Sequence, residues 1–255
     1  MAVRQFVEIG RGPIEYELVR GDHDRPPLVF LHEGLGSIDL WRGLPAEIAE
    51  RCGGATTLVY ARHGYGQSAP SEMPRPVTYM HHEADVVLPA LLAELHVERP
   101  VLVGHSDGAS IALLFAGAGG DVAGLVCLAP HVFVEPESVA GIEAAREAWE
   151  TTDLPARLGR YHADPTAAFR GWNDVWLSAE FRDWSIQDRL TGIEVPVFLV
   201  QGADDQYGTV AQLETIEADC AGTVERLLIE GAGHSPHLTA REWVVAAVAD
   251  FIGRL

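Results

Sequence analysis

The stretch Leu-Val-Gly-His-Ser-Asp-Gly-Ala-Ser-Ile-Ala-Leu-Leu, residues 102–114, decides the fold. It continues an apolar, β-branched run that predicts a buried strand, and its later apolar residues recur at helical spacing from about Ser106. Between the two elements, Gly104 and Gly108 of the pattern G-x-S-x-G permit a sharp turn in which a larger side chain would collide with its neighbours. Such a turn strains its apex residue and exposes the Ser106 hydroxyl beside the first N–H groups of the helix. The stretch therefore predicts a nucleophile elbow.

The main alternative for this stretch is the glycine-rich turn of a nucleotide-binding sheet. That interpretation needs a third glycine at the spacing of the dinucleotide fingerprint, or a lysine at the phosphate-loop position. The stretch has neither, so a nucleophilic serine is favoured.

The composition indicates a globular protein that acts on a small molecule. The chain has 255 residues, 47% of them hydrophobic, with no apolar run of 18 residues and no apolar signal region at its N-terminus. Its three cysteines have no C-x-x-C spacing, which argues against disulfides and thiolate metal sites. A net charge of −19 repels nucleic acid and anionic membrane surfaces. We expect a cytoplasmic monomer or homodimer with a small-molecule substrate.

The order of elements predicts an α/β fold. A hairpin is expected over residues 4–19, strands over 27–31, 56–60, 100–103, 125–128, 195–200 and 224–229, and helices over 41–51, 79–95, 209–220 and 242–252, besides the helix after Ser106. Strands that alternate with helices form a mostly parallel, doubly wound sheet, whose site lies in the loops at the carboxyl ends of the strands.

Residues 131–190 interrupt this alternation. They contain no convincing strand and carry four of the six tryptophans, including Trp172 and Trp176. We interpret them as a helical cap with an apolar underside, inserted between core segments 1–130 and 191–255. The alternative is a surface excursion whose tryptophans pack on the parent sheet.

Four motifs together resemble the α/β-hydrolase fold family, in particular small esterase-like and C–C-bond hydrolases with a helical cap. They are His-Glu-Gly at 32–34, G-x-S-x-G at 104–108, Gly-Ala-Asp-Asp at 202–205 and Gly-His-Ser-Pro at 233–236. The resemblance extends from Pro27 to Leu255. It implies a triad in the chain order serine, acid, histidine.

The residue types fit nucleophilic catalysis. A serine hydroxyl is a weak nucleophile at neutral pH and needs a base within hydrogen-bond reach. Histidine titrates near neutrality and can return the proton to the leaving group, while a carboxylate fixes its tautomer. Of eleven histidines, His234 lies in a glycine-containing loop after the last predicted strand, and His237 is the second candidate.

The resemblance also selects the acid and the oxyanion donors. The family places its carboxylate three residues after the glycine, which favours Asp205 over the adjacent Asp204. The backbone N–H groups of Asp107 and of Gly34, with Leu35 as an alternative to Gly34, are expected to hold the oxyanion.

Glu33 departs from the family, which more often has glycine directly after the histidine of this loop. A carboxylate that faced the oxyanion would oppose catalysis. We therefore expect Glu33 to point away or to pair with Arg62 or His63, and substrate contact is the alternative. Arg62 and His63 are expected to brace the loop.

The remaining assignments concern the pocket and the reaction. Candidate pocket residues are Glu33, Leu35, His131, Trp172, Trp176 and Tyr207. No cofactor is implied, and no metal is expected, because His81 and His82 are adjacent on a helix and face different directions. The expected activity is hydrolysis of a carboxylic ester or thioester of a small apolar acyl group through an acyl-enzyme. The alternatives are a C–C-bond hydrolase of a ring-cleavage dienone and a non-catalytic small-ligand receptor.

Overall fold

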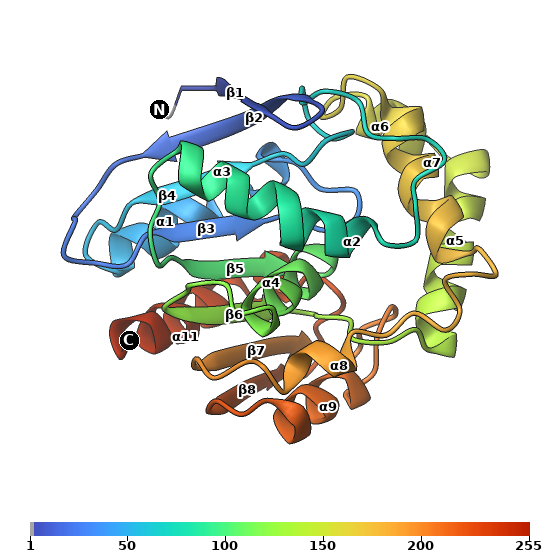
Figure 1. Cartoon of the computed structure of the whole chain (residues 1–255). Helices are drawn as coiled ribbons and strands as arrows, with labels where there is room; N and C mark the ends of the chain where they lie inside the picture. The colour runs from blue at the N-terminus through green and yellow to red at the C-terminus, as the bar shows by residue number, and fades with distance from the viewer. Residues whose placement is uncertain (1–2) are drawn as a thin grey trace.

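A computed structural model describes residues 3–255 and contains one eight-stranded sheet (Figure 1). Its strands are β1 (Gln5–Ile9), β2 (Gly12–Val19), β3 (Leu28–Leu31), β4 (Thr57–Tyr60), β5 (Val101–His105), β6 (Gly124–Leu128), β7 (Val197–Gly202) and β8 (Val224–Ile229). They lie in the order β1-β2-β4-β3-β5-β6-β7-β8. The β1–β2 and β2–β4 pairs are antiparallel and all other pairs are parallel. The predicted mostly parallel α/β sheet is confirmed.

The central strands are buried on both faces. In β3, Val29 and Leu31 belong to one core cluster, and Leu28 and Phe30 belong to the other. Because successive side chains of a strand point to opposite faces, this pattern requires a layer of helices on each side of the sheet.

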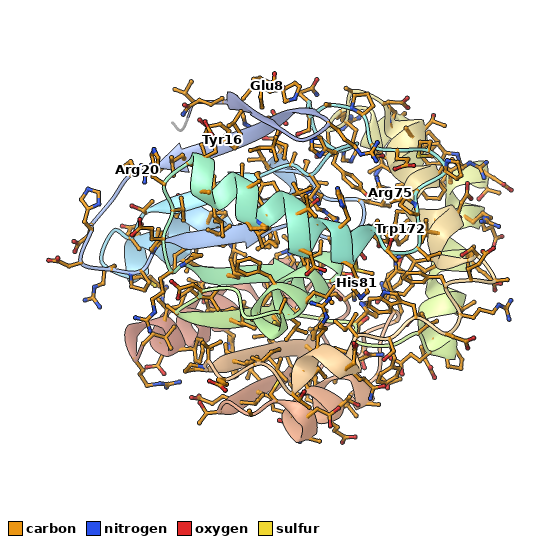
Figure 2. The ribbon with its side chains drawn as sticks, in the orientation of Figure 1. Glu8, Tyr16, Arg20, Arg75, His81 and Trp172 are labelled. Atoms are coloured by element: carbon orange, nitrogen blue, oxygen red, sulfur yellow. The ribbon has the colours of Figure 1, made fainter. Side chains whose placement is uncertain are left out.

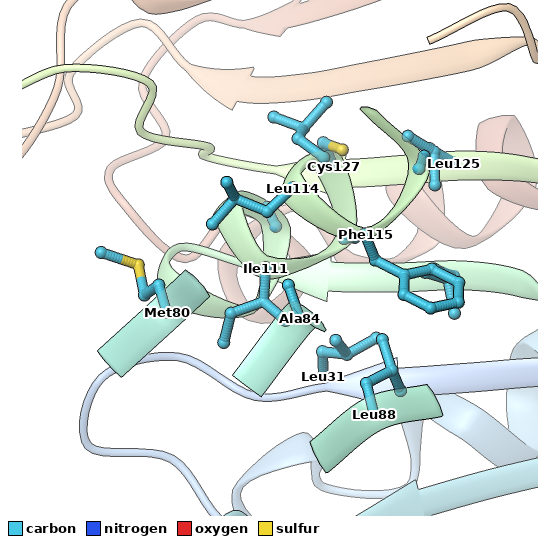
Figure 3. Close-up of a cluster of buried hydrophobic side chains, with 14 of the residues drawn as sticks. Leu31, Met80, Ala84, Leu88, Ile111, Leu114, Phe115, Leu125 and Cys127 are labelled. Carbon is cyan, nitrogen blue, oxygen red and sulfur yellow. The ribbon is translucent and has the colours of Figure 1, made fainter. Parts of the chain in front are cut away.

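Helices supply these two layers (Figure 1). One face is covered by α2 (Tyr79–His82), α3 (Leu88–Glu94), α4 (Asp107–Gly117) and α9 (Ala211–Asp219), and the other by α1 (Leu44–Arg51) and α11 (Arg241–Gly253). Figure 3 shows the first layer, where Leu88, Ile111 and Leu114 pack with Leu31 and Cys127 of the sheet. The remaining short helix of the core, α10 (Pro236–Thr239), precedes α11.

Four helices occupy the connection between β6 and β7. They are α5 (Pro136–Thr151), α6 (Leu154–Leu158), α7 (Pro165–Trp176) and α8 (Gln187–Leu190). Trp149 stacks on Phe169 with ring centroids 4.2 Å apart, so α5 and α7 pack through their aromatic residues. In Figure 1 the arrowheads of the parallel strands point toward α5 and α7, which therefore lie beyond the carboxyl ends of the sheet.

The single helix predicted over 79–95 is divided. Between α2 and α3 the chain forms a π-helical turn, η2 (Glu83–Val87). Pro89, in the first turn of α3, has no N–H to donate to a carbonyl one turn earlier, and its ring crowds that carbonyl. The widened turn accommodates this loss, so the helix continues in the same direction with a local change of pitch.

The helix predicted from Trp41 begins at Leu44. Before it, the chain forms a 3-10 turn, η1 (Asp39–Trp41), followed by Arg42 and Gly43 with φ of 50° and 80°. Within residues 3–255, no helix has the length and apolar character needed to cross a membrane.

Candidate active site

Ser106 lies at the turn between β5 and α4. Its φ of 52° and ψ of −118° are unfavourable for a residue with a side chain, and they aim the hydroxyl away from the sheet. A Cβ at Gly104 would lie 2.4 Å from the carbonyl oxygen of Gly108, and one at Gly108 would lie 2.0 Å from that of Leu31. Both positions therefore require glycine for steric reasons, as the sequence pattern indicated.

The ring of His234 lies between Ser106 and Asp205. Its Nε2 is 2.9 Å from the Ser106 hydroxyl oxygen, and its Nδ1 is 2.9 and 3.0 Å from the two carboxylate oxygens of Asp205. A carboxylate only accepts hydrogen bonds, so Nδ1 carries the proton and Nε2 presents its lone pair to the hydroxyl. The serine can then donate its proton to this nitrogen.

Asp205 follows β7 and is charged in this setting. Burial alone would raise the pKa of its carboxyl, but the hydrogen bond and charge of His234 lower the pKa below the usual range. The backbone N–H of Tyr207 donates to the same carboxylate at 2.8 Å. Asp204, the alternative acid, is exposed and is not among the polar partners of His234.

His237, the alternative base, lies outside the pocket of Ser106. It is buried, and its ring packs edge-on against His105 at 4.6 Å and beside Trp41 at 5.5 Å. Burial lowers the pKa of His237 well below the usual range, so the ring stays neutral among these aromatic neighbours. Its position is that of a packing residue beneath the site.

The two predicted oxyanion donors flank the serine. Asp107 is the first residue of α4, so its N–H has no acceptor within the helix. Its carboxylate turns away, accepts from Tyr79 at 2.6 Å and lies 3.7 Å from Arg62. Gly34 and Leu35 line the pocket of Ser106, and a Cβ at Gly34 would lie 2.2 Å from Nε1 of Trp172.

Arg62 holds the loop after β3 in place, as expected. Its guanidinium donates to the carbonyl oxygens of His32 and Glu33, at 3.3 and 2.9 Å. His63 contacts a different segment, the carbonyl oxygen of Gly12 at 3.2 Å. Neither residue pairs with the Glu33 carboxylate, so the expected partners of that carboxylate are wrong.

The partner of the Glu33 carboxylate is His105, which sequence reasoning missed. His105 Nε2 lies 2.8 Å from the carbonyl oxygen of His234, an acceptor, so Nε2 carries a proton. His105 Nδ1 lies 3.5 Å from Glu33 Oε2, an ion-pair distance. Burial opposes the charge of Glu33, but the hydrogen bond and charge of His105 lower the pKa of Glu33 far below the usual range.

Ser106 and His234 line a pocket of about 440 Å³. All six candidate pocket residues line it, namely Glu33, Leu35, His131, Trp172, Trp176 and Tyr207. Sequence reasoning missed Ser138, Ile142, Gln206, Ser235 and Thr239, which line it as well; of these, only Ser235 lies within one of the four motifs. Within residues 3–255, no group of three His, Cys, Asp or Glu side chains is placed to hold a metal ion.

Two similarities connect this chain to known sequences. The sequence model of the alpha/beta hydrolase family matches residues 28–247. An sn-1-specific diacylglycerol lipase from Danio rerio is 33% identical over 103 residues, which is 40% of this chain and 31% of that protein. The match thus spans about a third of the length of this relative.

Two further similarities extend over nearly the whole chain. A 2-succinyl-6-hydroxy-2,4-cyclohexadiene-1-carboxylate synthase from Serratia proteamaculans is 26% identical over 92% of this chain and 96% of its own. An esterase from Exiguobacterium antarcticum has a similar structure, with a TM-score of 0.78 and 19% identity over 98% of this chain and 99% of its own. At that identity, the structural likeness concerns the fold.

Proposed function

The chain belongs to the alpha/beta hydrolase family, and from that premise we propose that it cleaves a carboxylic ester or thioester of a small apolar acyl group. It is a hydrolase. The observation that carries the proposal is the 2.9 Å approach of His234 Nε2 to the Ser106 hydroxyl, with Asp205 bonded to the other ring nitrogen.

The proposed reaction has two halves. In the first, Ser106 attacks the substrate carbonyl while His234 takes the hydroxyl proton and then gives it to the leaving alcohol or thiol. In the second, a water molecule loses a proton to His234 and attacks the acyl carbonyl; the bond to Ser106 then breaks, and His234 returns the proton to the serine oxygen as the acid leaves. Asp205 stabilises the imidazolium in both halves.

Backbone N–H groups stabilise the charge that develops on the carbonyl oxygen. We assign this role to Asp107 and Gly34, because Asp107 begins α4 directly after Ser106 and Gly34 lines the same pocket as Ser106. In other serine hydrolases each such donor is worth about 10²–10³-fold in kcat.

The helical segment 131–190 is proposed to cap the pocket, with core segments 1–130 and 191–255 on either side in sequence. It contributes His131, Ile142, Trp172 and Trp176 to the pocket lining. The indoles and the isoleucine favour an apolar acyl group. Glu33 lies on the core wall of the same pocket and disfavours an anionic acyl group there.

A second candidate is hydrolysis of a C–C bond in a ring-cleavage dienone. The observation that favours it is the full-length match to the Serratia protein, whose name describes the synthesis of a cyclohexadiene carboxylate and not the cleavage of an ester. The same serine and histidine would serve that reaction.

The cellular compartment, the oligomeric state and the charge of the substrate are also proposals. The three cysteines, Cys52, Cys127 and Cys220, are free, which fits a reducing compartment, and we propose a cytoplasmic monomer or homodimer. The net charge of −19 favours neutral small-molecule substrates over nucleic acid or an anionic membrane surface.

A substrate panel tests these candidates. Wild type and Ser106→Ala are assayed with acetyl, butyryl and octanoyl esters, an acyl-CoA thioester and a dienone. The proposal expects turnover of at least one short ester or thioester, lost in Ser106→Ala. Turnover of the dienone alone would favour the second candidate, and no turnover of any substrate would favour a receptor.

A further inference from the structure

A second cavity, of about 180 Å³, shares no lining residue with the serine pocket. Its wall is built from the loop between β4 and α2, from α2 and η2, and from the turn between β1 and β2. Three arginines, Arg11, Arg62 and Arg75, line it, in a protein whose net charge is −19. This concentration of positive charge requires an explanation that the proposed reaction does not supply.

In the part of the chain that the structure describes, Arg75 is a buried cation without an anionic partner. Its side chain is 7% exposed and donates to two neutral hydroxyls, that of Tyr65 and that of Ser71 at 3.1 Å. Its guanidinium also lies over the rings of Tyr65 and Tyr79, with its carbon 4.7 and 5.3 Å from their centroids. Among residues 3–255, no carboxylate lies within 4.0 Å of it. Ring faces recover only part of the free energy that burial of a charge costs.

The other charges around the cavity are already compensated. Arg11 pairs with Glu72, and Arg62 lies 3.7 Å from Asp107. Glu83 accepts from the hydroxyl of Tyr60, and burial raises its pKa, so its negative charge is disfavoured. Among the described arginines and carboxylates that line the cavity, Arg75 is therefore left uncompensated.

We propose that this cavity binds a small anion, through a carboxylate or phosphate group held by Arg75. A guanidinium has five N–H donors in a plane, and the two hydroxyls leave others free for a second acceptor. Thr78 and His63 line the same cavity and are polar residues. The volume suits a group of a few atoms and excludes a nucleotide.

The anion site lies close to the proposed catalytic groups without belonging to them. Figure 2 labels Arg75 on the loop before α2, near Trp172 of α7. Tyr79, which also lines the cavity, donates to the Asp107 carboxylate at 2.6 Å and accepts from Trp176 at 3.1 Å. Trp176 in turn lines the serine pocket, so Tyr79 lies between the two cavities.

Isothermal titration with inorganic phosphate, and separately with acetate, tests the proposal. The proteins are wild type, Arg75→Met, Arg75→Lys and Arg20→Met. Within residues 3–255, Arg20 also has no carboxylate partner, but it is exposed and lies toward the opposite edge of the molecule from Arg75 in Figure 2. Circular dichroism tests whether each variant is folded. If Arg75→Met does not fold, Arg75→Lys is the variant compared with wild type.

The proposal expects one saturable site for at least one of the two anions. Its affinity should fall at least tenfold in Arg75→Met and should be unchanged in Arg20→Met. The loss should be smaller in Arg75→Lys, which keeps the positive charge but not the planar set of guanidinium N–H donors. Binding of phosphate alone or of acetate alone identifies the group. Failure of both anions to bind wild type, or equal affinity in the Arg75 variants and wild type, would overturn the proposal, whatever the outcome of the ester assays.

Discussion

The ring of His234 is held from several directions at once. Asp205 bonds its Nδ1, Ser106 meets its Nε2, and His105 donates to its backbone carbonyl oxygen at 2.8 Å. The rings of Tyr207 and His131 lie beside it, with centroids 4.7 and 5.5 Å away. This packing restricts rotation of the imidazole, so the hydrogen-bonded orientation is available before substrate binds.

The adjacent acids allow a matched test of the orienting carboxylate. Asp205→Asn is expected to lower kcat by about 10³–10⁴-fold, because an amide can donate to Nδ1 and then favours the wrong tautomer of His234. Asp204→Asn should retain kcat within about twofold, since its side chain is exposed. Steady-state kinetics with one ester measures both, and comparable losses in the two variants would contradict the assignment.

His131 predicts a pH dependence of stability. Burial, with the charge of His234, lowers its pKa from 6.5 to about 4. As the pH falls from 6.5 toward about 4, residue 131 binds a proton in the unfolded chain but stays neutral in the folded chain. The free energy of unfolding therefore falls with decreasing pH, by up to about 1.4 kcal/mol per pH unit from this group.

Urea titrations between pH 7 and pH 4 measure this effect. His131→Gln is expected to show a shallower decline than wild type, and the exposed His23→Gln should show the wild-type slope. Identical slopes in all three proteins would exclude a neutral, buried His131.

Sequence reasoning at the residue scale succeeded where a motif fixes a position and failed where a contact crosses the fold. The pattern G-x-S-x-G places Ser106, but it treats residue 105 as variable. His105 meets Glu33 only because β3 and β5 are neighbours in the sheet, an adjacency that no local pattern encodes. The expected partners of Glu33, Arg62 and His63, follow β4, which is the other neighbour of β3 in the sheet.

At the scale of elements, the elbow depends on the close approach of α4 to β3. Gly108→Ala is expected to lower the free energy of unfolding by several kcal/mol, because its Cβ would lie 2.0 Å from the carbonyl oxygen of Leu31. Gly253→Ala is the control, since nothing lies within 4 Å of a Cβ there. Thermal and urea unfolding measure both variants, and equal stabilities would mean that α4 can shift to relieve the contact.

The elements themselves were predictable to different degrees. Buried strands such as β3 and β6 were clear because their apolar runs are short and bounded by turn residues. The helix over 79–95 was predicted as continuous because Met80, Val87 and Leu91 keep helical spacing, whereas the π-helical turn arises from Pro89. Periodicity thus located the helix. It did not show the π-helical turn inside it, which follows from a backbone hydrogen bond that proline cannot make.

For the whole molecule, the order of the motifs predicted the architecture, but the pocket required the structure. Trp172 belongs to α7 and touches the Gly34 loop after β3, although 138 residues separate them. Such contacts between the helical segment and the core form the pocket. The concentration of tryptophans indicated an apolar cap, but the positions of Ser138 and Gln206 in the lining had no signal in the sequence.

The packing of Trp172 across the pocket predicts a change in acyl preference. Trp172→Ala removes an indole from the lining, so the ratio of kcat/KM for an octanoyl ester to that for an acetyl ester should rise about tenfold. Trp243→Ala, at a position 71% exposed on α11, should leave the ratio unchanged. Since a loss of folded protein lowers both rates equally, an unchanged ratio in Trp172→Ala would place the acyl group elsewhere.

The most direct measurement is the mass of the protein after reaction with a fluorophosphonate, followed by peptide mapping. The account predicts one adduct per chain, on the peptide that contains Ser106, absent in Ser106→Ala and formed orders of magnitude more slowly in His234→Ala. An adduct that persists in Ser106→Ala, or an unmodified Ser106 in a preparation that hydrolyses esters, would contradict it.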